Sequence, residues 1–226
     1  MDKLKKPYLS VCIPTSDMEG KIYFLKRALD SLWNQNFQDF EIVVTDNSTD
    51  GEIEAVCGWY GGGIRYIRNP RKGMAQNTNE GIKEAHGRLI KLLYMDDFMA
   101  NDYALGDIVT NFSGEWLVTG CSHTTDGENF FNIHEPSYND QIHLGNNTIG
   151  SPSVLTILNK TPLLFDEEMT WLLDADYYKR MHDLYGDPVF LNSVNVIMGV
   201  GQHQMTNTMG YERKLWEENY IKEKYA

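Results

Sequence analysis

The stretch LLYMDDFM, residues 92–99, joins an apolar run to two adjacent acidic side chains, Asp96 and Asp97. Short apolar runs of this kind are typical of buried strands. Two like charges at the end of such a strand repel each other and lose hydration, so something must offset that cost. A solvated turn would offset it, and so would a bound divalent cation. The stretch therefore predicts a strand end that is also a candidate cation site.

The residues before this stretch alternate between two periodicities. Runs rich in β-branched residues are separated by apolar residues at helical spacing, which is typical of βαβ units and a parallel sheet. We therefore expect an α/β fold with a mainly parallel sheet flanked by helices. The strands are expected at residues 9–13, 40–45, 64–67 and 88–95, and the helices at residues 21–35 and 74–86.

The second half of the chain is less regular. Polar residues predominate between residues 114 and 150, where we expect loops. An apolar segment follows at residues 153–158, and helices are expected at residues 176–185 and 211–226. Because the 226 residues contain no evident linker, a single compact domain is expected over residues 1–226.

The composition narrows the classes of partner. The formal net charge of −12 argues against nucleic acid, whose phosphates would be repelled. No run of about 18 apolar residues is present, so no transmembrane segment is expected. Cys12, Cys57 and Cys121 are widely spaced without a CxxC pair, which predicts reduced thiols in a cytoplasmic protein. An acidic protein can still bind a nucleotide through a metal ion.

Polar pairs follow three of the expected strands. The carboxyl ends of parallel strands share one edge of an open sheet, and ligands bind at that edge. Independent solvated turns would explain each pair alone, but they would not explain the common edge. We therefore expect the three pairs to line one crevice. They are Pro14 and Thr15, Asp46 and Asn47, and Asp96 and Asp97.

The order and spacing of these motifs resemble the inverting glycosyltransferases of family 2, which have the GT-A fold. Tyr94 stands where the family has the first aspartate of its D-x-D-D element. Thr78 stands where an arginine is frequent, and Arg71 or Lys72 is expected to supply that positive charge. The similar stretches span roughly residues 9–203 and are SVCIPT (10–15), EIVVTDNSTD (41–50), NEGIKEAHG (79–87), YMDD (94–97), GSPS (150–153), FDE (165–167) and DADYYKR (174–180).

The resemblance implies transfer of a sugar from a nucleotide-diphosphate sugar, of the UDP class, to a hydroxyl of a carbohydrate or glycoconjugate acceptor. It implies a donor half at residues 1–98 and an acceptor half at residues 99–226. Asp46 would accept the imide hydrogen of uracil, or it would cap a turn. The residues expected to contact the nucleotide are Pro14, Thr15, Asp46, Asn47, Lys72 and Asp96.

The resemblance also implies a Mn²⁺ or Mg²⁺ ion at the acidic pair. Carboxylates repel a diphosphate unless a cation lies between them, and that cation stabilises the leaving group. Asp97 is the expected principal metal ligand, with Asp96 nearer the ribose or a metal-bound water. His203 is a further candidate ligand, although a structural histidine is the alternative.

On the acceptor side, Asp174 is the expected general base. It lies just before the helix expected from Asp176, and a carboxylate there would take the proton of the acceptor hydroxyl. Contacts with the acceptor are expected from Ser153, Trp171 and Asp176. The alternatives are helix capping for the two aspartates and a packing role for the tryptophan.

Two other functional classes fit parts of the pattern. A sugar nucleotidyltransferase would need a glycine- and lysine-rich phosphate loop after the first strand, and IPTSDM at residues 13–18 does not provide one. Tyr94 and Thr78 stand where the family has an aspartate and frequently an arginine. They therefore leave open a non-catalytic domain that binds a nucleotide sugar or carbohydrate. Pairing of the C-terminal helix with a second copy of the chain is also left open.

Overall fold

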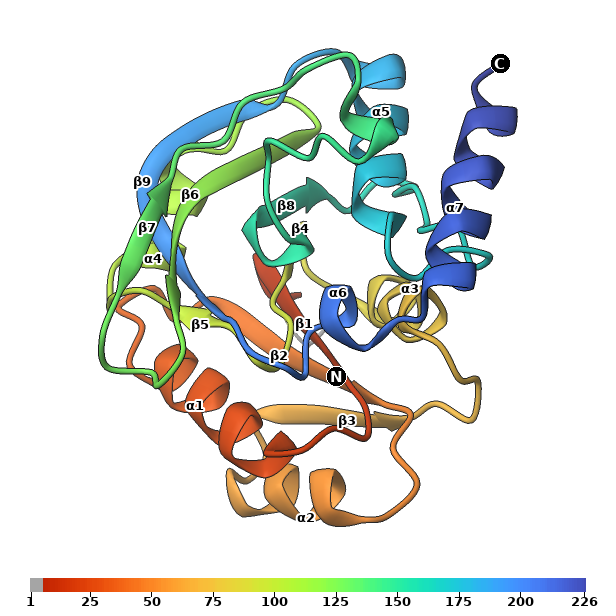
Figure 1. Ribbon diagram of the computed structural model, residues 1–226. Helices are drawn as coiled ribbons and strands as arrows, with labels where there is room; N and C mark the ends of the chain where they lie inside the picture. The colour runs from red at the N-terminus through yellow and green to blue at the C-terminus, as the bar shows by residue number, and fades with distance from the viewer. Residues whose placement is uncertain (1–5) are drawn as a thin grey trace.

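The computed structural model describes residues 6–226, in which one curled sheet carries helices on both faces (Figure 1). Residues 1–5 of the expected domain lie outside the described residues. The strands follow the order β3-β2-β1-β4-β8-β6-β9-β5, and β7 pairs with β6. The strands are β1 (Leu9–Thr15), β2 (Phe40–Asp46), β3 (Ile64–Arg68), β4 (Leu89–Leu92), β5 (Phe98–Met99), β6 (Trp116–Thr124), β7 (Phe131–His134), β8 (Leu155–Leu158) and β9 (Val189–Gly199).

The first half of the sheet is parallel, as the alternating pattern predicts. β1 pairs in parallel with β2 and β4, and β2 pairs in parallel with β3. The register sets Thr15 beside Asp46. β4 is shorter than expected because the chain turns after it, and the backbone N–H of Asp97 donates to the carbonyl of Tyr94 at 2.9 Å. That turn brings the acidic pair to the same edge as the ends of β1 and β2.

The second half holds more sheet than the sequence analysis predicts. β6 lies within the segment for which loops are expected, and that expectation is wrong. Nearly all of β6 is buried, and a strand buried on both faces lacks the polar alternation by which strands are recognised. β6 and β9 run parallel to each other, whereas β8 is antiparallel to both β4 and β6. The sheet is therefore mixed but mostly parallel.

Two apolar layers hold the helices to the sheet. One layer joins it to α1, α2 and α4 through buried residues such as Leu25, Ile53 and Ile108. The other joins it to α3, α5 and α7, with Ile82, Tyr178 and Ile221 among its members. The helices are α1 (Lys21–Trp33), α2 (Glu52–Trp59), α3 (Met74–Glu84), α4 (Ala104–Asn111), α5 (Leu173–Tyr185), α6 (Met205–Thr208) and α7 (Tyr211–Lys224).

Two sequence expectations concern the whole chain. The cysteines Cys12, Cys57 and Cys121 are free thiols and all three are buried. Across residues 6–226, no helix combines the length and the apolar character needed to cross a membrane.

Candidate active site

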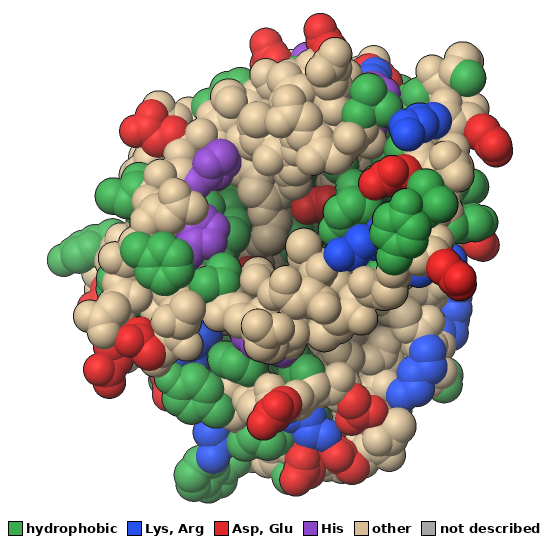
Figure 2. Space-filling model, in the orientation of Figure 1, with side chains coloured by type: hydrophobic (Ala, Val, Ile, Leu, Met, Phe, Trp, Pro, Cys, Tyr) green, Lys and Arg blue, Asp and Glu red, His purple; other side chains and the backbone are tan. Residues whose placement is uncertain are grey.

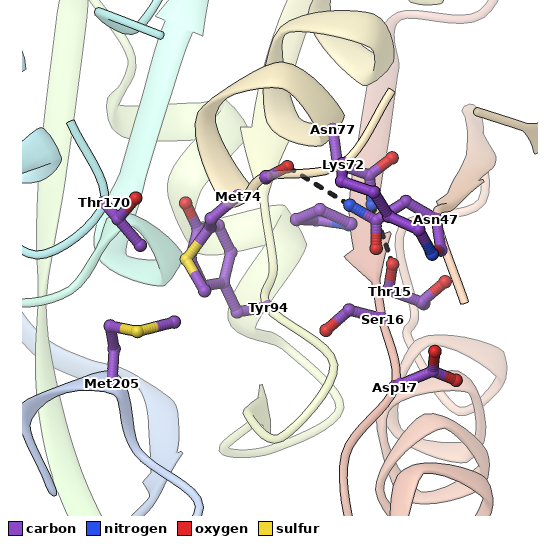
Figure 3. Close-up of a pocket in the computed structure, with 12 residues that line it drawn as sticks. Thr15, Ser16, Asp17, Asn47, Lys72, Met74, Asn77, Tyr94, Thr170 and Met205 are labelled. Atoms are coloured by element: carbon purple, nitrogen blue, oxygen red, sulfur yellow. Dashed lines mark hydrogen bonds between the residues drawn. The ribbon is translucent and has the colours of Figure 1, made fainter. Parts of the chain in front are cut away.

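A cavity of about 280 Å³ lies at the carboxyl ends of β1 and β2. Of the side chains expected to contact a nucleotide, Pro14, Thr15, Asn47 and Lys72 line it (Figure 3). Lys72, in the loop between β3 and α3, donates from Nζ to the carbonyl oxygen of Asn47. Asn47 donates from Nδ2 to the carbonyl oxygen of Gly73 at 3.2 Å. The two loops that form this cavity are thus joined to each other.

Asn77 of α3 also lines this cavity, and the sequence analysis missed it. Its Nδ2 donates to the carbonyl oxygens of Thr15 and Thr45, each at 2.8 Å. These bonds tie α3 to the ends of β1 and β2. Asn77 and Thr15 are both labelled in Figure 3. The available signal was the run of polar residues Asn77, Thr78 and Asn79 inside the expected helix, and all three are buried in α3.

Asp46 does not line this cavity. Its side chain is 0% exposed, and Oδ2 accepts hydrogen bonds from Tyr66 at 2.8 Å and from Arg68 at 2.6 Å. Oδ1 accepts from Thr15 Oγ1 at 3.1 Å and from the backbone N–H of Ser48 at 2.8 Å. In this arrangement Asp46 braces the ends of β1, β2 and β3 instead of facing a nucleobase.

Asp46→Ala is therefore expected to act mainly on stability. It would leave the backbone N–H of Ser48 and the hydroxyl of Tyr66 without their acceptor, at a cost on the order of 1–3 kcal/mol in free energy of unfolding. Thermal denaturation measures this cost, and Asp102→Ala, at an exposed aspartate outside the site, is the control. A variant with unchanged melting temperature and greatly weakened binding of uridine diphosphate would instead support a direct contact with the base.

A second cavity, of about 630 Å³, adjoins the first and shares part of its wall. It appears as a hollow in the face of the molecule, with acidic side chains inside (Figure 2). The shared lining residues are Pro14, Ser16, Asp17, Met74, Tyr94, Thr170 and Met205. The cavity brings together the expected site residues Asp96, Asp97, Trp171, Asp174 and His203, which come from distant parts of the sequence.

The acidic pair is held by the end of β9. Asp97 is only 4% exposed, and its Oδ1 accepts the backbone N–H of Gly199 at 2.9 Å. A side chain at position 199 would clash with the backbone oxygen of Asp96, so this close approach requires glycine. Burial, followed by the neighbouring charge of Asp96, raises the pKa of Asp97 to about 8. The position therefore favours neutralisation of the Asp97 charge, by a proton or by a cation.

His203 lies next to the acidic pair, as a candidate ligand should. Its Nε2 is 3.1 Å from Oδ2 of Asp96, and this contact raises the pKa of His203. Its ring also lies 4.9 Å from that of Phe24 on α1. The histidine is therefore paired with a carboxylate and packed against an aromatic ring.

The residues at this position fit a hard divalent cation. Within residues 6–226, no cluster of three or more His, Cys, Asp or Glu side chains has the arrangement of a metal site. The site instead offers two carboxylates, those of Asp96 and Asp97. Two are enough for Mg²⁺, which is commonly bound through one or two carboxylates together with substrate phosphates and water.

Asp174 lines this cavity from the C-terminal half of the chain. α5 begins at Leu173, so Asp174 belongs to the first helical turn instead of preceding the helix. Its Oδ1 accepts the backbone N–H of Ala175 at 2.7 Å, and its Oδ2 accepts from Asn147 Nδ2 at 2.8 Å. Burial of the carboxyl raises the pKa of Asp174 to about 6. A carboxylate with this pKa is suited to proton transfer near neutral pH.

Two residues expected to contact the acceptor do not reach the cavity. Asp176 is 0% exposed, and its carboxylate pairs with Arg180 and Lys224, each at 2.8 Å. Residues two apart on a helix differ by about 200° in direction, so Asp174 and Asp176 face opposite sides. Ser153 is also 0% exposed, and its Oγ accepts the backbone N–H of Tyr94 at 2.8 Å. Both expectations of a direct acceptor contact are wrong in this geometry.

Comparison with known proteins agrees with the fold and shows the family. Residues 10–178 match the family model described as glycosyl transferase family 2. The GalNAc(5)-diNAcBac-PP-undecaprenol beta-1,3-glucosyltransferase of Campylobacter jejuni is 31% identical over 96 residues, which cover 40% of this chain and 30% of that enzyme. Such matches amount to between 10% and 40% of the length of the curated relatives, so the chain spans less than half of each.

Solved structures show the same fold. The mannosyltransferase PcManGT of Pyrobaculum calidifontis, in complex with GDP-Man and Mn²⁺, superposes with a TM-score of 0.66 at 16% identity, covering 99% of this chain and 66% of that one. Residues 1–349 of TarS of S. aureus, in complex with UDP-GlcNAc, give 0.65 at 17% identity, covering 94% of this chain and 69% of that one. The matched family model spans most of the sequence, and the chain therefore belongs to glycosyl transferase family 2.

Proposed function

We propose that this chain transfers a sugar from a nucleotide-diphosphate sugar to a hydroxyl of a carbohydrate or glycoconjugate acceptor. The observation that carries the proposal is that Asp97 and Asp174 line the larger cavity. The smaller cavity, which we propose as the nucleotide site, adjoins it. In this proposal Asp97 anchors a metal ion and Asp174 accepts a proton, and both residues line the same cavity. Transfer between two bound substrates requires such an arrangement.

The smaller cavity is the proposed nucleotide site. Pro14, Thr15 and Asn47 would contact the base and ribose there, and the Lys72 ammonium would offset negative charge on the diphosphate. We favour a UDP-sugar because TarS, which shares the fold, has been solved with UDP-GlcNAc. GDP-Man in PcManGT makes a guanosine donor the alternative.

In the proposed reaction, the Asp174 carboxylate takes the proton of the acceptor hydroxyl. The oxygen forms a bond to the anomeric carbon, while the bond from that carbon to the diphosphate oxygen breaks. The electron pair of that bond leaves with the nucleoside diphosphate. Attack opposite the leaving group inverts the anomeric configuration, and no covalent enzyme intermediate is needed.

A Mn²⁺ or Mg²⁺ ion, if bound by Asp97 and Asp96, would neutralise charge on the departing diphosphate. The ion in the PcManGT complex is Mn²⁺. His203, already paired with Asp96, would restrain that carboxylate or serve as a further ligand.

Calorimetric titration with UDP and with GDP, each with and without Mn²⁺, tests the donor site. Release of nucleoside diphosphate from UDP-GlcNAc and GDP-Man, with water or added sugars as acceptor, tests turnover. Binding of either nucleotide without any release would identify a non-catalytic binding domain, and failure to bind both would contradict the proposal.

Lys72→Gln is expected to weaken UDP binding by about tenfold or more, because a hydrogen bond to a charged group contributes roughly 1.5–3 kcal/mol. Arg71→Gln is the matched control, since Arg71 is exposed, pairs with Glu167 and does not line the cavity. Calorimetry at fixed ionic strength separates the two variants. Equal weakening by both would indicate general electrostatic attraction, and no weakening by either would exclude Lys72 from the diphosphate site.

A further inference from the structure

Glu217, on the C-terminal helix α7, is a fully buried acid that belongs to neither cavity. Its side chain is 0% exposed. Its carboxylate accepts the backbone N–H groups of three consecutive residues: Thr170 at 2.9 Å, Trp171 at 2.8 Å and Leu172 at 3.0 Å. Arg213, one turn earlier on α7, donates from Nε to the same carboxylate at 3.1 Å. These donors offset the cost of burying the charge.

The three residues held by Glu217 lead directly into the proposed acceptor side. Thr170 and Trp171 line the larger cavity, as does Asp174 two positions after Leu172. The carbonyl of Leu172 accepts the first N–H bond of α5, from Asp176 at 3.0 Å. The position of Leu172 therefore sets where α5 begins, and with it the direction in which Asp174 points.

α7 is anchored to this region by other contacts as well. Tyr220 donates to Asp166 at 3.0 Å, and Lys224 pairs with Asp166 at 2.6 Å and with Asp176 at 2.8 Å. None of these contacts involves residues 170–172. Removing the Glu217 charge should therefore free the backbone of that segment while α7 stays in place.

We infer that Glu217 is a positioning residue, which holds residues 170–172 so that Asp174 meets the acceptor hydroxyl in reactive geometry. The inference rests on the proposed function, since it assumes that Asp174 is the base. A displacement of about 1 Å in a reacting group can cost about 10²-fold in rate. Glu217 is bonded to residues 170–172 and to Arg213, and of residues 170–172 only Thr170 also lines the smaller cavity, so donor affinity should depend on Glu217 much less than the rate does.

The test is Glu217→Gln, which keeps the shape of the side chain and removes its charge. Release of nucleoside diphosphate from the two donors should fall by up to about 10²-fold, while the dissociation constant for UDP with Mn²⁺ changes by a much smaller factor. Hydrogen exchange at the amides of residues 170–172 should accelerate by about tenfold or more. Glu217→Asp, which keeps the charge on a shorter side chain, should recover part of the rate. It replaces the glutamine variant if that variant does not fold.

Tyr220→Phe is the matched control, because it removes a contact of the same helix with Asp166 and leaves residues 170–172 bonded. It should lower the melting temperature without changing the release rate. Equal losses of rate in the Gln and Phe variants would overturn the inference, as would an unchanged rate in Glu217→Gln. If wild-type protein releases no diphosphate from either donor, the proposed function fails. In that case, unaltered hydrogen exchange at the amides of residues 170–172 in Glu217→Gln would still overturn the positioning role.

Discussion

Asp174→Asn should lower the rate of sugar transfer by about 10²–10⁴-fold, which is the usual contribution of general-base assistance. Asparagine keeps the shape of the side chain and loses the proton acceptor, and Asp174 lies outside the nucleotide cavity. Donor affinity should therefore remain close to that of wild type. Release of nucleoside diphosphate and calorimetry with UDP measure the two quantities separately.

Asp176→Asn is the matched control for this variant. Its carboxylate is buried and pairs with Arg180 and Lys224, so its loss should lower the melting temperature with a much smaller effect on rate. If Asp176→Asn is inactive while Asp174→Asn retains full activity, the base has been assigned to the wrong aspartate. If both variants remain active, the reaction uses another base.

The pH dependence of the wild-type rate provides a second test of Asp174 as the general base. Burial raises the pKa of Asp174 to about 6, and the carboxylate must be charged to accept a proton. The rate should therefore fall as the pH drops through about 6, and this acidic limb should be absent from the residual activity of Asp174→Asn. A limb that persists in the variant would belong to a different group.

Asp97→Ala should abolish the part of UDP binding that depends on Mn²⁺. Without this carboxylate, only Asp96 and its partner His203 remain next to the proposed cation position. The fold should survive, because the substitution removes a buried acid whose pKa is already raised to about 8 by burial and by Asp96. Calorimetry with UDP, with and without Mn²⁺, and thermal denaturation measure both effects.

Asp102→Ala controls for the loss of one acidic charge, since Asp102 is exposed and does not line either cavity. It should bind UDP with Mn²⁺ as wild type does. Persistence of full Mn²⁺-dependent binding in Asp97→Ala would remove the central argument for a cation at the acidic pair.

The candidate site was predicted in part from residues that lie at strand ends. Thr15 and Asn47 were placed correctly in one cavity, because their position depends only on where a strand stops and on the parallel direction of its neighbours. Asp46, adjacent to Asn47, was assigned to the nucleobase and instead braces three strands. Two successive residues at a strand end point in opposite directions, and sequence position alone does not tell which one faces the ligand.

Asp174 and Asp176 show the same limit on a helix. Either one could have faced the cavity, and the answer depends on where α5 begins. That starting point depends on residues 170–172, which are held by Glu217 more than forty positions later in the chain. No local pattern around the two aspartates contains this information.

The sequence by itself determined the parallel half of the sheet, two of the helices that cover it, α1 and α3, and the edge at which polar residues gather. Those features follow from hydrophobic periodicity and from the residues at element ends, both of which act over a few neighbouring positions. Only the tertiary structure decided that β6 and β9 complete the sheet, that Gly199 approaches Asp96 and Asp97, and that Glu217 holds the segment before α5. These features depend on contacts between distant segments, where burial and hydrogen bonding are set by the partner and not by the local sequence.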